Sequence, residues 1–329
     1  MALLEVKDIV VDFSTRAGVA RVLDHVSLKV EAGQTLGVVG ESGCGKSMTA
    51  LSIMGLVPNP PGEVTSGSIT LDGEELIGAE EQRMRKIRGK DISMIFQEPM
   101  TSLNPVFTVG EQIAESLRLH EEGSNADAWA KAVEMIRSVG IPEPETRARN
   151  YPHQLSGGMR QRIMIAMALA CGPRLLIADE PTTALDVTVQ AQIFDLLKDL
   201  QSENNTSIIL ITHDMGVISQ MSDYVAVMYA GRIIETGTTQ DILSSPRHPY
   251  TKGLIACVPH LEENPSDERA PLMEIPGVVP PLTKLGKGCA FAPRCSQKMP
   301  ECDTAKPSMV KCSNSHMAAC LALSSEVAT

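Results

Sequence analysis

The feature that most constrains the fold is a short apolar stretch, residues 36–39, that runs directly into the pattern G-x-x-x-x-G-K-S. A strand that enters such a loop, followed by a helix, leaves backbone N–H groups free to surround the phosphates of a nucleotide. The lysine reaches the outer phosphates, and the hydroxyl after it holds Mg²⁺. The alternative is a glycine-rich turn in which Lys and Ser occur by chance. The apolar strand before the loop argues against it, because the phosphate-binding motif requires that strand. The predicted nucleotide-binding residues are Gly40, Glu41, Ser42, Gly43, Cys44, Gly45, Lys46, Ser47 and Met48.

Length and charge limit the class of protein. A chain of 329 residues suggests about two domains. The net charge of −11 argues against a nucleic-acid binder, which would carry a basic surface. The first residues lack the pattern of a signal peptide, and no apolar run approaches the roughly 20 residues that span a bilayer. We therefore expect a cytosolic chain, or one held at a membrane by partners.

The patterns before and after the loop predict a mixed α/β chain. Apolar residues favour strands at 3–13 and 21–30, which indicates a β-rich N-terminal layer. Phe13 lies at the edge of this layer and either stacks on adenine or belongs to the core. Further along, we expect a strand at 68–73, a helix at 74–88, a strand at 92–97 that ends in Gln97, and a capping box of Thr108 with Glu111 that opens a helical insertion.

A second anion-binding helix start is predicted at Leu155–Met159. Ser156, Gly157 and Gly158 precede an apolar helix, and helix N-termini favour anions. An ordinary helix cap is the alternative. Because the chain has two such sites and only one lysine-bearing loop, the second site is expected to serve a nucleotide held by another subunit.

Acidic and imidazole side chains follow two further predicted strands. Residues 175–180 form a short apolar strand that ends in Asp179 and Glu180. Asp179 is placed to hold Mg²⁺ and Glu180 to polarise the attacking water, although solvated acids at a strand end would look the same. Asp186 lies in the loop before the next helix. His213 ends the strand at 207–213 and either contacts a γ-phosphate or is a surface residue.

The alternation of strands and helices after the first phosphate-binding turn predicts a mostly parallel α/β core. Periodicity fades and proline becomes frequent after residue 245, so we place a domain boundary there. Residues 1–245 then form one domain with a helical part at about 97–160, and residues 246–329 form a small irregular extension.

The cysteines form one cluster and several single sites. Cys289, Cys295, Cys302 and Cys312 lie in the extension with spacing C-x₅-C-x₆-C-x₉-C. Disulfides are disfavoured in a reducing compartment, which leaves zinc and a [4Fe–4S] cluster open. Residues 281–312 carry six bases and two acids, a formal charge of +4 that would offset a thiolate cluster or simply form a solvated face. Separately, the presence of Cys44 is explained by a small residue where serine would also serve, but its place near a helix start and Lys46 still predicts an accessible thiol with a lowered pKa.

With these motifs in place, residues 1–245 resemble the ATPase subunits of ABC transporters. The loop at 40–47, Gln97, the signature at 155–159, the strand at 175–180, Ala184–Asp186 and His213 occur in the order of that family, with Met159 where many members have Gln. Residues 95–105 and 247–251, together with the extension, resemble the bacterial dipeptide and oligopeptide importer ATPases.

The resemblance implies an ABC-type P-loop NTPase fold and an ATP-hydrolysing subunit that powers peptide import. In that scheme Ser47, Asp179 and Gln97 organise Mg²⁺, Glu180 is the general base, and His213 holds the γ-phosphate. The implied partners are a second homologous ATPase, two membrane permeases and an extracytoplasmic solute-binding protein, at the cytoplasmic face of the inner membrane. The resemblance also implies a [4Fe–4S] cluster on the four cysteines. Nothing in the residues places the extension in hydrolysis, so a structural role is expected for it.

Two other functions compete with this interpretation. Relatives in the same group import nickel or glutathione, and the sequence does not name the solute. A soluble ABC ATPase of DNA repair or translation is the second alternative. Such proteins usually carry two ATPase halves or a nucleic-acid-binding insertion, whereas this acidic chain has one half.

Overall fold

The computed structural model describes residues 2–16, 18–97, 102–182, 186–258 and 273–326. By its internal contacts the chain divides into two compact units. We call them the helical unit, made of Met1–Leu3, Val30–Thr35 and Glu75–Leu210, and the phosphate-loop unit, made of Leu4–Lys29, Leu36–Glu74 and Ile211–Thr329. Each is described separately.

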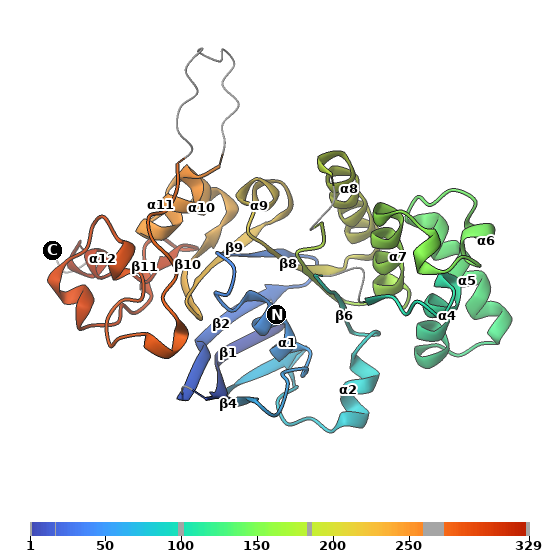
Figure 1. Ribbon diagram of the computed structural model, residues 1–329, viewed down its shortest axis with the longest axis horizontal. Coiled ribbons are helices and arrows are strands. Elements are labelled where there is room, and N and C mark those ends of the chain that lie inside the picture. The colour runs from blue at the N-terminus through green and yellow to red at the C-terminus, as the bar shows by residue number, and fades with distance from the viewer. Residues whose placement is uncertain (1, 17, 98–101, 183–185, 259–272, 327–329) are drawn as a thin grey trace, which may run out of the picture. The chain divides into compact units, whose positions relative to one another are not determined.

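The helical unit contains two parallel strands and a group of helices. Strands β6 and β7 pair in parallel, from Ile92 opposite Leu175 to Ile95 opposite Ala178. Helices α4, α5 and α7 pack against one another, as Figure 1 shows in green and yellow-green. The elements are α2 (Glu81–Ile87), β6 (Ile92–Ile95), α4 (Val109–His120), α5 (Asn125–Ser138), α6 (Pro144–Arg147), η1 (Pro152–Gln154), α7 (Gly157–Leu169), β7 (Leu175–Asp179) and α8 (Val187–Asn204).

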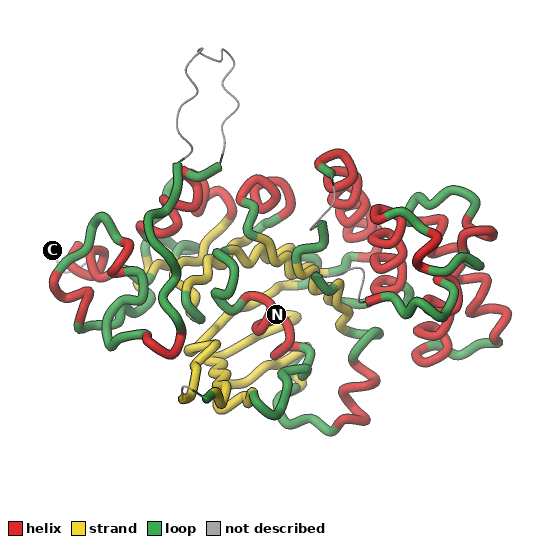
Figure 2. Tube along the Cα trace, in the orientation of Figure 1, coloured by secondary structure: helices red, strands yellow, loops and turns green. Residues whose placement is uncertain are grey.

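The phosphate-loop unit contains an antiparallel layer and most strands of a second sheet (Figure 2). The strands of the antiparallel layer have the order β2-β1-β4-β5. The strands of the second sheet that belong to this unit have the order β11-β12-β10-β9-β3. Its first elements are β1 (Ala2–Thr15), β2 (Gly18–Glu31), β3 (Thr35–Val39), α1 (Lys46–Ile53), β4 (Gly62–Leu71) and β5 (Glu74–Glu75). The later ones are α9 (Met215–Met221), β9 (Tyr224–Tyr229), β10 (Arg232–Thr238), α10 (Thr239–Ser244), α11 (Pro249–Ala256), η2 (Leu282–Lys284), η3 (Ala292–Arg294), η4 (Pro300–Asp303), β11 (Val310–Lys311), β12 (Met317–Ala318) and α12 (Leu321–Glu326). Strand β8 (Ser207–Thr212) begins in the helical unit and ends in this one.

The extension shares a core with the sheet that carries the phosphate loop. Phe291 of the extension and Tyr250 of α11 are buried in one cluster with Val39 at the end of β3 and with Tyr229 of β9. Strand β12 adds to β10 through Glu235 opposite Ala318. Residues on both sides of position 245 contribute to this core. The domain boundary near residue 245 stays a prediction.

A buried carboxylate anchors the beginning of the extension. Glu235 of β10 is fully buried, and its two oxygens accept hydrogen bonds from the backbone N–H groups of Arg247 and His248 at 2.6 and 2.9 Å. His316 Nε2 lies 2.7 Å from the same side chain. Buried carboxylates are stable when several donors satisfy them, so this residue fixes where α11 starts.

Two local predictions were wrong. Residues 74–88 do not form one helix, because β5 occupies Glu74–Glu75 and α2 begins only at Glu81. Thr108 is the N-cap of α4, but its side chain makes no capping hydrogen bond, so the predicted capping box is absent. The reciprocal cap occurs instead at α5, where the Ser124 side chain accepts from the N–H of Asp127, whose carboxylate accepts from the N–H of Ser124.

Candidate functional site

The phosphate loop connects β3 to α1 within one unit, as the sequence predicts. Gly43 and Gly45 adopt φ values of +77° and +109°, a region that side chains disfavour. At Gly40 a Cβ would lie 2.2 Å from the carbonyl oxygen of Met228. The loop is therefore packed so closely against β9 that glycine is required at its first position.

Lys46 is held inside the loop by its backbone. Its Nζ donates to the carbonyl oxygens of Gly40 at 2.7 Å and Glu41 at 3.2 Å, and 5% of the residue is exposed. A buried ammonium held by two carbonyls is positioned to face an anion entering the loop. Ser47 follows in the first turn of α1 and is half-buried.

Cys44 does not have the accessible thiol that the sequence predicted. Its side chain is fully buried, and burial raises the pKa of the thiol above its ordinary value. The positive charge of Lys46 lowers this pKa only in part. The prediction of an acidic, exposed thiol was wrong because the loop backbone turns this side chain toward the core.

Gln97 and Glu180 are brought together in the helical unit. Each lies two residues beyond the last paired residues of β6 and β7, Ile95 and Ala178. Gln97 Nε2 donates a hydrogen bond of 3.1 Å to Glu180 Oε2. Glu180 has a φ of +47°, an uncommon conformation for glutamate and one that is found at functional sites. Asp179, the last residue of β7, is 4% exposed.

The signature and the following acidic residue cap two helices of the same unit. The Ser156 hydroxyl accepts from the N–H of Met159 at 3.3 Å at the start of α7, with Gly157 and Gly158 in the first turn. Asp186 Oδ1 accepts from the N–H of Val189 at 2.9 Å at the start of α8. Ala184 and Leu185 lie outside the described residues.

Two further residues predicted to contact the nucleotide lie in the phosphate-loop unit. His213 directly follows β8 and is exposed. Phe13 of β1 pairs with Gly62 of β4, where a Cβ would lie 2.6 Å from the phenyl ring. Phe13 therefore covers a glycine, and its stacking on adenine stays a prediction.

Three of the four predicted cluster ligands converge on one small cavity. Cys289, Cys295 and Cys302 line it together with Cys320, and its volume is about 20 Å³. Cys312 is not among its lining residues, and its thiol contacts the carbonyl of Val310 at 3.7 Å. The fourth thiol at this cavity therefore differs from the predicted one.

The cavity between these thiols is small compared with a metal cluster. In the part of the chain that the structure describes, no group of three or more His, Cys, Asp or Glu side chains stands ready to hold a metal ion. A cavity of about 20 Å³ has room for roughly one water molecule, so a cluster would require the side chains to separate. Burial raises the pKa of the Cys289 and Cys295 thiols above the ordinary value.

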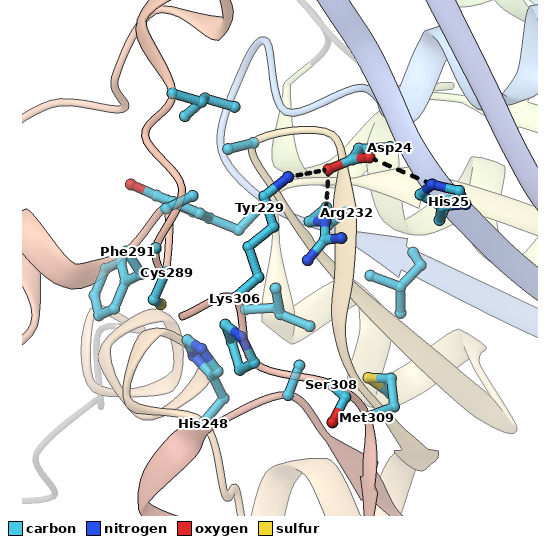
Figure 3. Close-up of a pocket in the computed structure, with 18 of the residues that line it drawn as sticks. Asp24, His25, Tyr229, Arg232, His248, Cys289, Phe291, Lys306, Ser308 and Met309 are labelled. Carbon is cyan, nitrogen blue, oxygen red and sulfur yellow. Dashed lines mark hydrogen bonds and ion pairs between the residues drawn. The ribbon is translucent and has the colours of Figure 1, made fainter. Parts of the chain in front are cut away.

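A larger cavity of about 340 Å³ lies between the antiparallel layer and the extension (Figure 3). Asp24 faces it and accepts from Arg232 Nε at 2.8 Å and from Lys306 Nζ at 3.0 Å. Burial acts to raise the pKa of Asp24, but the Lys306 hydrogen bond and the charge of Arg232 together bring it below its ordinary value. Sequence reasoning did not predict this triad, because its members are far apart in the chain.

Comparison with known proteins identifies the family. Residues 23–183 match the ABC transporter family model, and residues 234–302 match the model of the oligopeptide/dipeptide transporter C-terminal region. The oligopeptide transport ATP-binding protein OppD of Bacillus subtilis is 53% identical over 95% of this chain and 87% of its own length. The dipeptide transport ATP-binding protein DppD of the same organism is 50% identical over 96% of this chain and 93% of its own length.

The chain belongs to the ABC transporter ATPases of the oligopeptide and dipeptide transport group. Among solved structures, the ATP-binding cassette MJ0796, a dimer with bound ADP and Pi, is similar with a TM-score of 0.65 and 27% identity, covering 72% of this chain and 98% of that one. The resemblance and the ABC-type fold expected from the sequence are confirmed. This ABC ATPase also has no helix, among its described residues, with the length and apolar character needed to cross a membrane.

Sequence reasoning missed two residues at the phosphate loop. Tyr250 Oη accepts from the N–H of Glu41 at 2.9 Å, and Arg294 forms two hydrogen bonds with the Glu41 carboxylate. The sequence groups Arg294 only with the bases around the cysteines, and Tyr250 only with the motif at 247–251. No sequence signal pairs either residue with a loop more than 200 positions away.

Proposed function

We propose that this ABC ATPase powers the import of dipeptides or oligopeptides as one subunit of a multi-subunit transporter. The observation that carries the proposal is the match of residues 234–302 to the C-terminal region of oligopeptide/dipeptide transporters. A generic ABC ATPase would match over the nucleotide-binding part alone. Relatives that share about half of their residues with nearly the whole chain are named as peptide, dipeptide or oligopeptide transport proteins. Their names support peptides as the substrate class.

We propose a hydrolysis mechanism from the chemistry of these residue types. Lys46 and the N–H groups of the loop bind the phosphates, and adenine stacks on Phe13. Ser47, Asp179 and Gln97 would supply oxygen ligands of the kind that Mg²⁺ prefers, and the ion would neutralise phosphate charge. Glu180 accepts a proton from the attacking water, and His213 donates to the γ-phosphate. Most of the catalytic effect is then positioning and charge stabilisation.

The assembly is proposed to be a heterodimer of ATPases on two permease subunits, served by an extracytoplasmic solute-binding protein. Ser156, Gly157, Gly158 and Asp186 would then contact the nucleotide bound by the partner ATPase. Exposed helix starts at α7 and α8 support this, because both leave N–H groups accessible. The location that follows is the cytoplasmic face of the inner membrane, held there through the permeases.

We further propose that the cysteines of the extension bind a [4Fe–4S] cluster. Cys289, Cys295, Cys302 and Cys320 line one small cavity and would have to move apart to hold a cluster, and basic residues nearby would offset its charge. Anaerobically purified protein should be brown, with broad absorbance near 400 nm and about four iron atoms per chain. Cys320→Ser should lose iron and Cys312→Ser should keep it if the cavity marks the site. The reverse result would restore Cys312 as the fourth ligand, and colourless protein with one zinc would exclude the cluster.

The substrate is tested in a strain that lacks the gene for this chain. We expect the strain to lose growth on dipeptides or oligopeptides as the only source of a required amino acid, and the intact gene to restore it. The Glu180→Gln gene should fail to restore growth although the protein is made. Normal peptide use together with a loss of nickel or glutathione uptake would move the assignment to those importers. Normal uptake of all three would favour a soluble ABC protein.

A further inference from the structure

An ion pair links the extension to the phosphate loop. Arg294 lies in the extension, and Glu41 is the second residue of the loop. Arg294 Nη1 donates to Glu41 Oε2 at 2.6 Å, and Nη2 donates to Oε1 at 2.9 Å. A bidentate pair of this kind is the strongest arrangement between an arginine and a carboxylate. Only 3% of the Arg294 side chain is exposed, compared with 31% for Glu41.

The guanidinium of Arg294 is also held by contacts other than the one with Glu41. Its Nε donates to the carbonyl of Pro276 at 2.8 Å, and Nη2 also donates to the carbonyl of Ile275 at 3.0 Å. Its central carbon lies 6.0 and 5.9 Å from the ring centres of Tyr229 and Phe291. The Glu41 hydrogen bonds raise the pKa of this guanidinium further, so it stays charged.

The same segment also holds the backbone of Glu41. Tyr250 is fully buried, and its hydroxyl accepts from the N–H of Glu41. The ring of Tyr250 packs 5.4 Å from Phe291 and 4.7 Å from Tyr229, between centres. Aromatic pairs of this kind prefer defined angles, which makes the support rigid.

Glu41 matters for the nucleotide because of where it stands. Its carbonyl oxygen is one of the two acceptors of Lys46 Nζ, so its backbone helps to position the phosphate-binding lysine. Its side chain brings a negative charge to a loop whose function is to bind a triphosphate. An unpaired carboxylate at this position would repel the ligand.

We propose that Arg294 is a positioning residue for ATP binding, which acts by neutralising and orienting Glu41 at the start of the phosphate loop. The extension is then part of the nucleotide-binding apparatus rather than only a structural appendage. Arg294 does not contact the nucleotide in this account, and its effect passes through the Glu41 carboxylate.

The test is the equilibrium affinity of the full-length chain for MgATP. Arg294→Ala should weaken binding about tenfold, because it leaves the Glu41 charge uncompensated. The matched control is Lys298→Ala in the same segment, whose ammonium pairs with Asp303 at 2.8 Å on the surface. Lys298→Ala should leave the affinity unchanged.

A double variant distinguishes a loss of affinity caused by the Glu41 charge from one caused by lost packing of Arg294. The double variant Glu41→Gln with Arg294→Ala should bind MgATP within about threefold of the unmodified chain, because the repelling charge is gone although the arginine is missing. If Arg294→Ala does not fold, Arg294→Gln serves in its place, since its amide can still donate to the Ile275 or Pro276 carbonyl. Unchanged affinity in the soluble Arg294 variant would overturn the proposal. Equal weakness of the double variant and the single variant would also overturn it, because the loss would then come from packing alone.

Discussion

Gln97 Nε2 donates a hydrogen bond to Glu180 Oε2 across 3.1 Å, which joins the ends of two neighbouring parallel strands. In parallel sheets the carboxyl ends of the strands lie at one edge, where ligands bind. The amide therefore restrains the carboxylate that is proposed to act as general base.

The first prediction concerns Gln97. Gln97→Ala should keep ATP binding within about threefold and lower the hydrolysis rate by roughly 10- to 100-fold, because misplacing a reacting group costs about that much. The measurement is kcat and the ATP affinity of the same preparation. Gln154→Ala, which removes an amide from the same unit near α7, is the control and should leave kcat close to normal. A Gln97→Ala enzyme with unchanged kcat would separate this hydrogen bond from catalysis.

Much of this site could be predicted from the sequence because its parts are local. The strand, loop and helix around Lys46 are contiguous, and Gln97 and Glu180 each end an apolar run that reads as a strand. If the two strands are parallel neighbours, the side chains at their carboxyl ends lie at the same edge of the sheet. Gln97 and Glu180 are then expected to lie close together. The fold class followed from the same alternation of strands and helices.

The pairings that the sequence could not predict join distant residues. Arg294 and Glu41 are 253 positions apart, and spacing alone did not distinguish Cys320 from Cys312 at the thiol cavity. The burial of Cys44 also depends on tertiary packing, since the Gly40 position and β9 enclose the thiol. Local charge and helix position suggested an acidic thiol, but desolvation has the larger effect.

Gly40 supplies the second prediction. Gly40→Ala places a Cβ 2.2 Å from the Met228 carbonyl oxygen, so β9 or the loop has to move. Overpacking of this kind costs about 1–3 kcal/mol, and nucleotide binding should also be lost. Gly286→Ala is the control, since no atom lies within 4 Å of its Cβ position. Denaturant unfolding with and without ATP measures both effects, and a Gly40→Ala protein that unfolds and binds ATP normally would contradict the close packing.

The third prediction concerns Cys44. At pH 7 its buried, protonated thiol should react with a maleimide at least tenfold more slowly than an exposed thiol, and the inhibition of ATP hydrolysis should be equally slow. Because the thiolate is the reactive form and its pKa is raised, the rate should still increase with pH beyond the range in which the rate of an exposed thiol levels off. Peptide mapping after timed labelling gives the rate at this site. Rapid modification of Cys44 in the folded protein at pH 7 would restore the original prediction of an accessible thiolate.

The fourth prediction uses the lowered pKa of Asp24. A carboxylate whose pKa is lower in the folded than in the unfolded state stabilises the fold above its unfolded pKa, near 3.8, and this contribution is lost as the pH falls through the folded value. Lys306→Met removes one partner, so it should lower stability at pH 7 by up to about 1 kcal/mol, the range of partly exposed pairs. It should also reduce the loss of stability on acidification.

Urea unfolding midpoints between pH 7 and pH 3 measure this effect. Lys298→Met, in the same extension but paired with Asp303 on the surface, is the control and should follow the unmodified chain. Identical pH profiles for Lys306→Met and the unmodified chain would show that Lys306 does not set the pKa of Asp24.

Glu180→Gln tests the central claim most directly. In the assembled transporter, with the general base of the partner ATPase inactivated in every sample, we measure ATP hydrolysis and ATP affinity of the Glu180→Gln variant. Loss of a general base typically costs about 10²–10⁴ in rate, so hydrolysis should fall by that factor while ATP affinity stays within about threefold. Glu203→Gln, an exposed glutamate at the end of α8, is the control and should leave both unchanged. Near-normal hydrolysis in Glu180→Gln would contradict the assigned catalytic site and the mechanism built on it.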